Sequence, residues 1–272
     1  MNTGRRLSYN SYLRIDELLA LQQPRSEPAH HDELLFIVIH QVYELWFKEV
    51  LHEIEAAIRH LDSGALLHAQ RNLRRIFAIQ RTLEGQVDVL ETMTPQEFNA
   101  FRDGLDPASG FQSAQFREIE FLCGARKSGY LHFLDQTEGE RARLQGRLEQ
   151  PSLHDAWLAL LARRGFATAP HEALVASVQT IYERAQTHYD LYLLAEDLIE
   201  FDERFLLWRG RHVRMVERMI GMKPGTGGSL GVPYLEKTLS KKFFPELWDV
   251  RTLLGEGTYG GRPAAPADGT SS

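Results

Sequence analysis

The 272-residue chain has a single cysteine, Cys123, which excludes both an intrachain disulfide and a cysteine-rich zinc site. It also lacks any run of about 18 consecutive apolar residues, the length at which a membrane-spanning helix becomes a candidate. Its first residues show neither the apolar stretch nor the small-residue cleavage site of a signal peptide. From these absences we expect a cytoplasmic protein with no segment in a membrane.

An excess of positive charge is missing as well. The chain has 31 lysine and arginine residues against 37 acidic residues, which gives a net charge of −6 with histidine neutral. A mildly acidic protein is a poor candidate for non-specific binding to nucleic acid or to an anionic membrane. Hydrophobic residues make up 43% and charged residues 25%, which is ordinary for a globular protein.

Apolar residues recur at three- and four-residue steps almost everywhere, and no alternating series predicts a sheet. This spacing predicts helices over residues 31–61, 66–91, 94–102, 112–123, 136–148, 151–164, 171–186, 189–222 and 244–254. The short break between the first two favours antiparallel packing, as in a bundle. We therefore predict an all-α, bundle-like single domain over residues 30–255. It follows an N-terminal segment, 1–29, and precedes a tail, 256–272, with the composition of disorder.

Two histidines stand on apolar helix faces. His40 shares a face with Phe36, Tyr43 and Phe47, at spacings of four, three and four residues. His212 lies on the same side of its helix as neighbouring aromatic and methionine residues. A histidine among apolar neighbours is more often a hydrogen-bonded core residue than a ligand, and both interpretations stay open. No HExxH motif or tight histidine–carboxylate spacing predicts a zinc or iron triad.

The glycine-rich stretch at 223–231 and Arg102 are the other candidates. Glycines can free backbone amides to bind an anion, but this stretch lacks the GK[ST] ending of a nucleotide P-loop. A flexible connection between helices explains it equally well. Arg102 follows Phe98 by one helical turn, an arrangement suited to clamping a carboxylate. A solvated surface arginine is the simpler alternative.

Five stretches in order along most of the chain resemble the tryptophan 2,3-dioxygenase family. They are LSYNSYLRIDELLALQ, HDELLFIVIHQVYELWFKE, FNAFRDGLDPASGFQSAQFREIEF, WRGRHVRMVERMIG and KPGTGGSLGVPYL. The HQVYELWFK segment is long and specific, and SGFQS and GTGG stand at the expected places.

The resemblance implies a helical subunit that encloses a haem b pocket, in a homotetramer whose N-terminal segments dock on neighbouring subunits. It implies insertion of both atoms of O2 across the indole C2–C3 bond of L-tryptophan. The product would be N-formyl-L-kynurenine, in the first step of tryptophan degradation by the kynurenine pathway. No nucleic acid or membrane partner is expected.

The resemblance also implies roles for individual residues. His212 falls on the axial ligand of the haem iron, and His40 on the distal histidine that contacts the indole N–H. The implied substrate-binding positions are Phe36 and Phe98 in the indole pocket, Arg102 at the carboxylate, Thr226 at the ammonium and carboxylate end, Ser109 and Gly110 in the loop beside the distal haem face, and Tyr9 and Tyr12 entering from a neighbouring subunit.

The resemblance has two weak points. Phe98 is a tyrosine in some relatives, so a hydroxyl contact is absent there, and residues 127–170 match weakly and give no site residues. Two other classes of function remain open, a haem-binding sensor or carrier without turnover and a helical scaffold without a cofactor. Arg102, Thr226 and the two tyrosines favour an enzyme, because a gas sensor needs no clamp for an amino acid.

Overall fold

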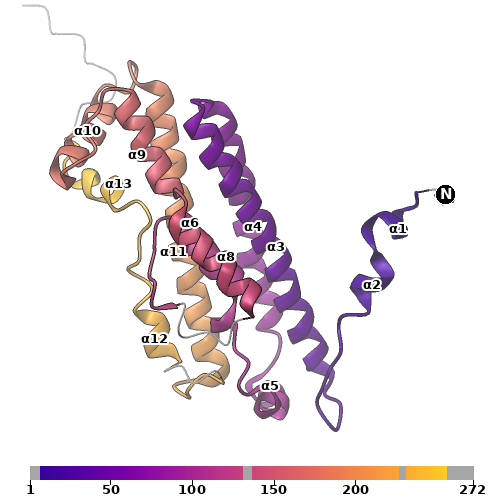
Figure 1. The fold of residues 1–272 in the computed structure, drawn as a ribbon. Coiled ribbons are helices and arrows are strands. Elements are labelled where there is room, and N and C mark those ends of the chain that lie inside the picture. The colour runs from indigo at the N-terminus through magenta and orange to yellow at the C-terminus, as the bar shows by residue number, and fades with distance from the viewer. Residues whose placement is uncertain (1–6, 131–136, 227–230, 256–272) are drawn as a thin grey trace, which may run out of the picture.

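The computed structural model describes residues 7–130, 137–226 and 231–255, and within these ranges it contains helices and loops but no strand. Three long helices lie side by side: α3 (His31–Asp62), α4 (Leu66–Leu90) and α11 (Tyr189–Ile220) (Figure 1). Helix α4 packs along both of the others, whereas α3 and α11 make little backbone contact with each other. The all-α, bundle-like prediction is confirmed.

The antiparallel pair of α3 and α4 follows directly from the sequence pattern. Gly64 has a φ of +76° in the tight turn between them, a conformation that suits glycine. The apolar stripes of the two helices meet in the main core, where Ile54 and Leu73 have no exposed surface. Truncating such a side chain to alanine typically costs about 2–5 kcal/mol of stability.

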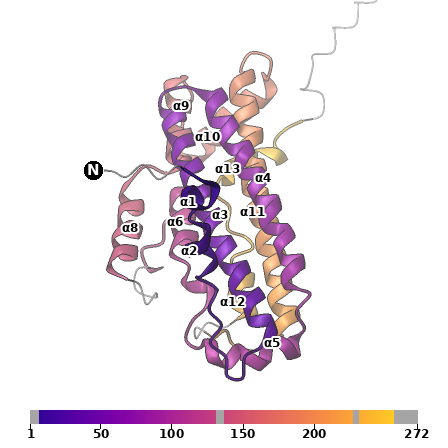
Figure 2. The ribbon, with the colours of Figure 1, turned by 90° about the vertical axis from the view of Figure 1, so that its right-hand side faces the viewer.

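Shorter helices close the two ends of the long bundle and cover one side (Figure 2). They are α5 (Pro95–Arg102), α6 (Ala114–Leu122), α8 (Glu138–Glu149), α9 (Leu153–Arg163), α10 (His171–Glu183), α12 (Val232–Glu236) and α13 (Pro245–Asp249), with 3-10 turns η1 (Asp103–Leu105), η2 (Gly110–Gln112) and η3 (Val250–Thr252). Their bounds agree with the predicted helices to within a few residues, except that α12 was not predicted.

Capping explains where several of these helices begin. At α5 the Thr94 hydroxyl accepts from the Glu97 amide at 3.3 Å, and the Glu97 carboxylate accepts from the Thr94 amide at 2.6 Å. Pro95 occupies the first helical position, where its missing N–H costs nothing. This start was predicted from the sequence, and it fixes the direction of the helix that carries Phe98 and Arg102.

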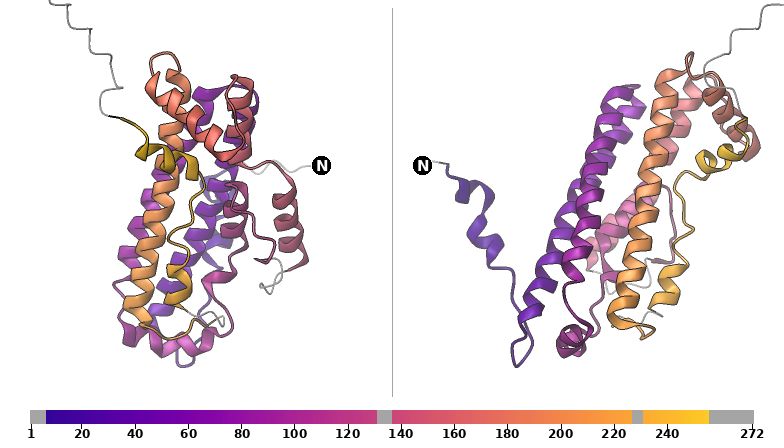
Figure 3. Two further views of the ribbon diagram at one scale, coloured as in Figure 1. Left: turned by 90° about the vertical axis from the view of Figure 1, so that its left-hand side faces the viewer. Right: turned by 180° about the vertical axis from the view of Figure 1, so that it is seen from behind.

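The N-terminal segment stands away from the helical body (Figures 1 and 3). Its two short helices, α1 (Tyr9–Leu13) and α2 (Ile15–Leu19), bury no residue against the rest of the chain. Among the described residues the segment is fastened near its base, where the Gln41 side-chain amide donates to the Leu21 carbonyl at 3.2 Å and the Glu33 carboxylate accepts from the Arg25 and Ser26 amides at 2.8 and 2.9 Å. Docking on a neighbouring subunit therefore stays a prediction, and the tail at 256–272 lies outside the described residues.

No helix in the described ranges has the length and apolar character needed to cross a membrane.

Candidate functional site

The structure brings the two helical histidines together from distant parts of the chain. His40 on α3 and His212 on α11 lie near enough for the charge of one to affect the other. Both rings lie deep in the protein, yet each keeps part of its surface accessible. They lie on α3 and α11, the two long helices that make little backbone contact with each other.

His212 is neutral and has a free lone pair. Burial lowers its pKa to about 4, and the nearby His40 adds to this effect. Among the described residues His212 makes no hydrogen bond, and its ring stacks on Trp208 with centroids 5.5 Å apart and planes 22° apart. The same residues contain no group of three or more histidine, cysteine or acidic side chains arranged for a metal ion. A single buried, neutral imidazole that is free to bond fits the axial ligand of a haem iron.

His40 has a defined tautomer. Its Nδ1 atom lies 2.7 Å from the Phe36 carbonyl oxygen, and because a carbonyl can only accept, Nδ1 carries the proton. Burial lowers the pKa of His40, while the Phe36 carbonyl and the Glu44 carboxylate partly oppose that shift. The ring is therefore neutral near pH 7, and its Nε2 atom is free to accept a hydrogen bond.

Aromatic rings form one wall beside His40. The Phe36 ring lies 4.1 Å from the His40 ring and 5.6 Å from the Phe98 ring, measured between centroids. Phe101, whose side chain is 3% exposed, closes the wall at 5.7 Å from Phe36 and 5.5 Å from Phe98. Such a wall excludes water and offers a flat apolar surface to a planar ligand.

A second aromatic group lies on the other side of the two histidines, one turn along each helix. Trp208 contacts Phe116 of α6 at 5.3 Å and Tyr43 of α3 at 6.3 Å between centroids. The Trp208 indole N–H donates weakly to the Tyr43 hydroxyl at 3.5 Å. Phe47, on the same face of α3 as His40, belongs to the main core instead. The aromatic face of α3 therefore runs from a second hydrophobic cluster beside His40 to the main core.

Arg102 and Thr226 lie where three segments meet at one end of the bundle. The Arg102 guanidinium donates to the Pro224 carbonyl at 2.5 Å, and the Thr226 hydroxyl donates to the Ala108 carbonyl at 2.6 Å. These bonds tie the loop after α11 to α5 and to the loop that follows α5. No acidic side chain of the described residues pairs with Arg102, so its charge is available to a ligand carboxylate.

Glycine is required at the far end of the loop that carries Thr226. Gly231 has a φ of +63°, and a Cβ atom there would lie 2.6 Å from the Lys223 carbonyl oxygen. Only glycine allows the loop to close on itself at this point. Gly227 and Gly228, in the middle of the predicted glycine-rich stretch, lie outside the described residues.

Ser109 and Gly110 form a short capped turn ahead of α6. The Ser109 hydroxyl accepts from the Phe111 amide at 3.3 Å, and the Ser109 amide donates to the Gln112 side chain at 3.1 Å. A Cβ atom at Gly110 would have no other atom within 4 Å, so the backbone faces open space there. Tyr9 is 77% exposed and stands on the N-terminal segment, which the chain does not fold back onto this site.

Comparison with known proteins decides the family. The tryptophan 2,3-dioxygenase family profile matches residues 1–161 and 136–254. A tryptophan 2,3-dioxygenase of Nocardioides sp. is 50% identical over 256 residues, covering 92% of this chain and 96% of the relative. The chain belongs to the tryptophan 2,3-dioxygenase family. Proteins of the same name from Herpetosiphon aurantiacus and Xanthomonas euvesicatoria are 51% and 46% identical, covering 91% and 95% of this chain and 98% and 90% of theirs.

Within this family member, sequence reasoning missed two aromatic residues that contact the rings beside the histidines. Phe101 could have been found from its position three residues after Phe98, on the same helical face. Phe116 carried no signal, because an aromatic residue on an amphipathic helix is usually core. The structure brings Phe36, Phe98 and the two histidines together and puts Arg102 at one end of the bundle. It leaves Tyr9 and Tyr12 apart.

Proposed function

We propose that this chain is a haem-dependent enzyme that inserts both atoms of O2 across the indole C2–C3 bond of L-tryptophan, giving N-formyl-L-kynurenine. Membership of the family supports an oxidoreductase with tryptophan 2,3-dioxygenase activity. The observation that carries the finer proposal is the pair of neutral, deeply placed histidines on facing helices. One has a lone pair free for iron, and the other has an acceptor nitrogen free for the substrate.

His212 would hold the iron of haem b. Its imidazole is held by stacking on Trp208, and its low pKa keeps the lone pair unprotonated. When bound, the haem supplies the site for O2 and the electronic chemistry that activates it. The protein's share is to place the substrate, keep water out and hold each proton at a defined atom.

His40 would orient the indole. Its Nδ1–H is committed to the Phe36 carbonyl, so Nε2 is the atom that can accept the indole N–H. The electron-rich C3 of indole can react without full removal of the N–H proton, so His40 need not act as a general base. The rings of Phe36, Phe98 and Phe101 give the indole an apolar surface, without a hydroxyl at Phe98.

Arg102 and Thr226 would bind the amino-acid end of the substrate. A guanidinium can give two parallel N–H donors to a carboxylate, which fixes direction as well as distance. Thr226 and the turn at Ser109 and Gly110 would complete that end of the pocket, because the Thr226 hydroxyl already contacts the neighbouring Ala108 carbonyl.

The assembly is part of the proposal. Tyr9 and Tyr12 are 77% and 71% exposed on a segment that does not pack on its own body, and we infer that they enter the site of a neighbouring subunit. A homotetramer in the cytoplasm, built from a domain at 30–255 with an exchanged segment at 1–29, is the arrangement we propose.

One assay tests the function. The purified protein is loaded with haem, reduced, and mixed with L-tryptophan in air while the formation of N-formyl-L-kynurenine is followed by absorbance and mass spectrometry. Product with both oxygen atoms derived from labelled O2 is expected. Haem binding without any product would instead support a carrier or sensor, and the absence of haem binding would support a scaffold.

A further inference from the structure

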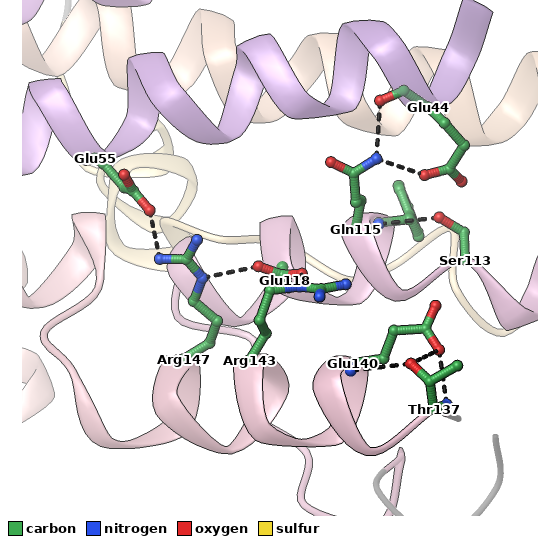
Figure 4. Close-up of polar contacts among 10 residues, drawn as sticks. Glu44, Glu55, Ser113, Gln115, Glu118, Thr137, Glu140, Arg143 and Arg147 are labelled. Carbon is green, nitrogen blue, oxygen red and sulfur yellow. Dashed lines mark hydrogen bonds and ion pairs between the residues drawn. The ribbon is translucent and has the colours of Figure 1, made fainter. Parts of the chain in front are cut away.

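A bridge between α3 and α6 lies one helical turn from His40 (Figure 4). The side-chain amide of Gln115 donates to the carboxylate of Glu44 at 2.8 Å and to the backbone carbonyl of the same residue at 2.9 Å. Glu44 follows His40 by four residues on α3, and its charge acts on the pKa of His40. The bridge is therefore connected, through one turn of helix, to the residue that would orient the indole.

The other end of the bridge leads to the loop at 103–113. Gln115 is the second residue of α6, and Ser113 caps this helix by accepting from the Phe116 amide at 3.1 Å. The turn at Ser109 and Gly110 ends at that cap. Fixing Gln115 against α3 thus fixes where this turn stands relative to His40.

Helix α6 is held in place by ion pairs with α8. It therefore cannot easily move when the bridge between Gln115 and Glu44 is changed. Glu118 of α6 is 2% exposed and accepts from Arg143 and from Arg147 of α8, both through Nε at 3.0 Å. Arg147 also pairs with Glu55 of α3 at 2.5 Å (Figure 4). These contacts give a structural role to α8, a helix for which the resemblance implied no site residue.

We propose that Gln115 and Glu44 are a positioning pair for the reaction, which sets the separation between His40 and the turn at Ser109 and Gly110. The proposal rests on the proposed function. The pair acts on substrate binding, because the proposed function gives this turn to the substrate while the Nδ1–H of His40 stays bonded to the Phe36 carbonyl. The KM for L-tryptophan should therefore change more than kcat.

The test uses the haem-loaded full chain with Gln115→Glu, Glu44→Gln and the double exchange. Gln115→Glu places two carboxylates together and removes both donated bonds, and we expect KM to rise about tenfold, with kcat within about threefold of the wild type. The double exchange restores one side-chain hydrogen bond with the donor and acceptor reversed, and it should recover most of the KM. It cannot recover all, because a carboxylate at 115 cannot donate to the carbonyl of residue 44.

Gln179→Glu is the matched control. Gln179 of α10 also donates to a carboxylate, that of Glu183 at 2.8 Å, and to a backbone carbonyl, that of Leu253 at 3.4 Å. It lies on an element that carries no pocket residue, so this change should leave KM as it is. A general loss of stability would affect the control too and would not be reversed by the exchange.

The outcomes separate the two proposals. A wild-type protein without tryptophan turnover would overturn the proposed function, and this pair with it. Wild-type turnover with an unchanged KM in Gln115→Glu, or a double exchange no better than the single change, would overturn the pair alone. Thermal unfolding of the wild type and the four variants, measured alongside, should show Gln115→Glu and Gln179→Glu to be similarly folded.

Discussion

The Nδ1 atom of His40 donates to the carbonyl oxygen of Phe36, one turn earlier on the same helix, at 2.7 Å. This single contact decides what the histidine can do. It leaves Nε2 as the acceptor, and with burial it keeps the ring neutral at pH 7. The orientation needs no partner from another element, so it is already set in the absence of substrate.

The pH dependence of activity follows from that contact. Burial holds the pKa of His40 below its usual 6.5, so the acceptor at Nε2 is present above the folded pKa and is lost as pH falls through it. The acid limb of kcat/KM should therefore lie below pH 6.5. The groups facing His40 are Glu44, whose charge raises this pKa, and His212, whose lone pair the iron would occupy. Glu44→Gln should move the limb to lower pH, and a shift upward would contradict the assignment.

His212→Ala tests the iron ligand. The change should remove most of the bound haem, or alter its visible spectrum, while the helical content measured by circular dichroism is kept. His171→Ala is the control. His171 is a half-exposed histidine that pairs with Asp249 at 3.0 Å rather than with a residue of the candidate site. A His212→Ala protein with an unchanged haem spectrum would show that another residue holds the iron.

The N-terminal segment should link substrate binding to assembly. Deleting residues 1–20 removes α1 and α2, none of whose residues is buried, so the fold should survive. We expect the KM for L-tryptophan to rise and the oligomer, measured by light scattering, to loosen together. Tyr189→Ala serves as a control for losing an exposed tyrosine, since Tyr189 is 58% exposed on α11. An active monomer with unchanged KM would contradict the exchanged segment.

The fold was largely predictable because apolar residues recur over many turns of a long helix and so show the helical period. Helices α1, α2 and α12 were not predicted, since five residues are too few to show a period; α13 is equally short, but it continues directly into η3. The site was harder to predict from the residues alone. His40 and His212 lie on different long helices, and nothing in their local spacing says that they lie near each other. The contact of Arg102 with Pro224 could not be predicted either, because it depends on how the loop after α11 returns to α5.

Arg102 separates an amino-acid enzyme from a general haem protein. An indole alone cannot fix its own direction in an apolar pocket, whereas a carboxylate held by two parallel N–H donors can. A hydrogen bond to a charged group is worth about 1.5–3 kcal/mol. Arg102→Ala should therefore lower kcat/KM for L-tryptophan roughly 10- to 200-fold, since about 1.4 kcal/mol is a factor of ten. Arg102→Lys keeps the positive charge but lacks the two parallel N–H donors, and it should be impaired as well.

Arg102 also donates to the Pro224 carbonyl, so its role could be purely structural. Two comparisons test this alternative. Arg163→Ala removes another arginine that donates to a backbone carbonyl, that of Leu61 at 2.6 Å, and it should leave kcat/KM nearly unchanged. Tryptamine, which has no carboxylate, should be a poor substrate of the wild type, and Arg102→Ala should harm it far less than L-tryptophan. If both substrates slowed equally, Arg102 would be holding the loop rather than the carboxylate, because only a lost carboxylate contact can distinguish between them.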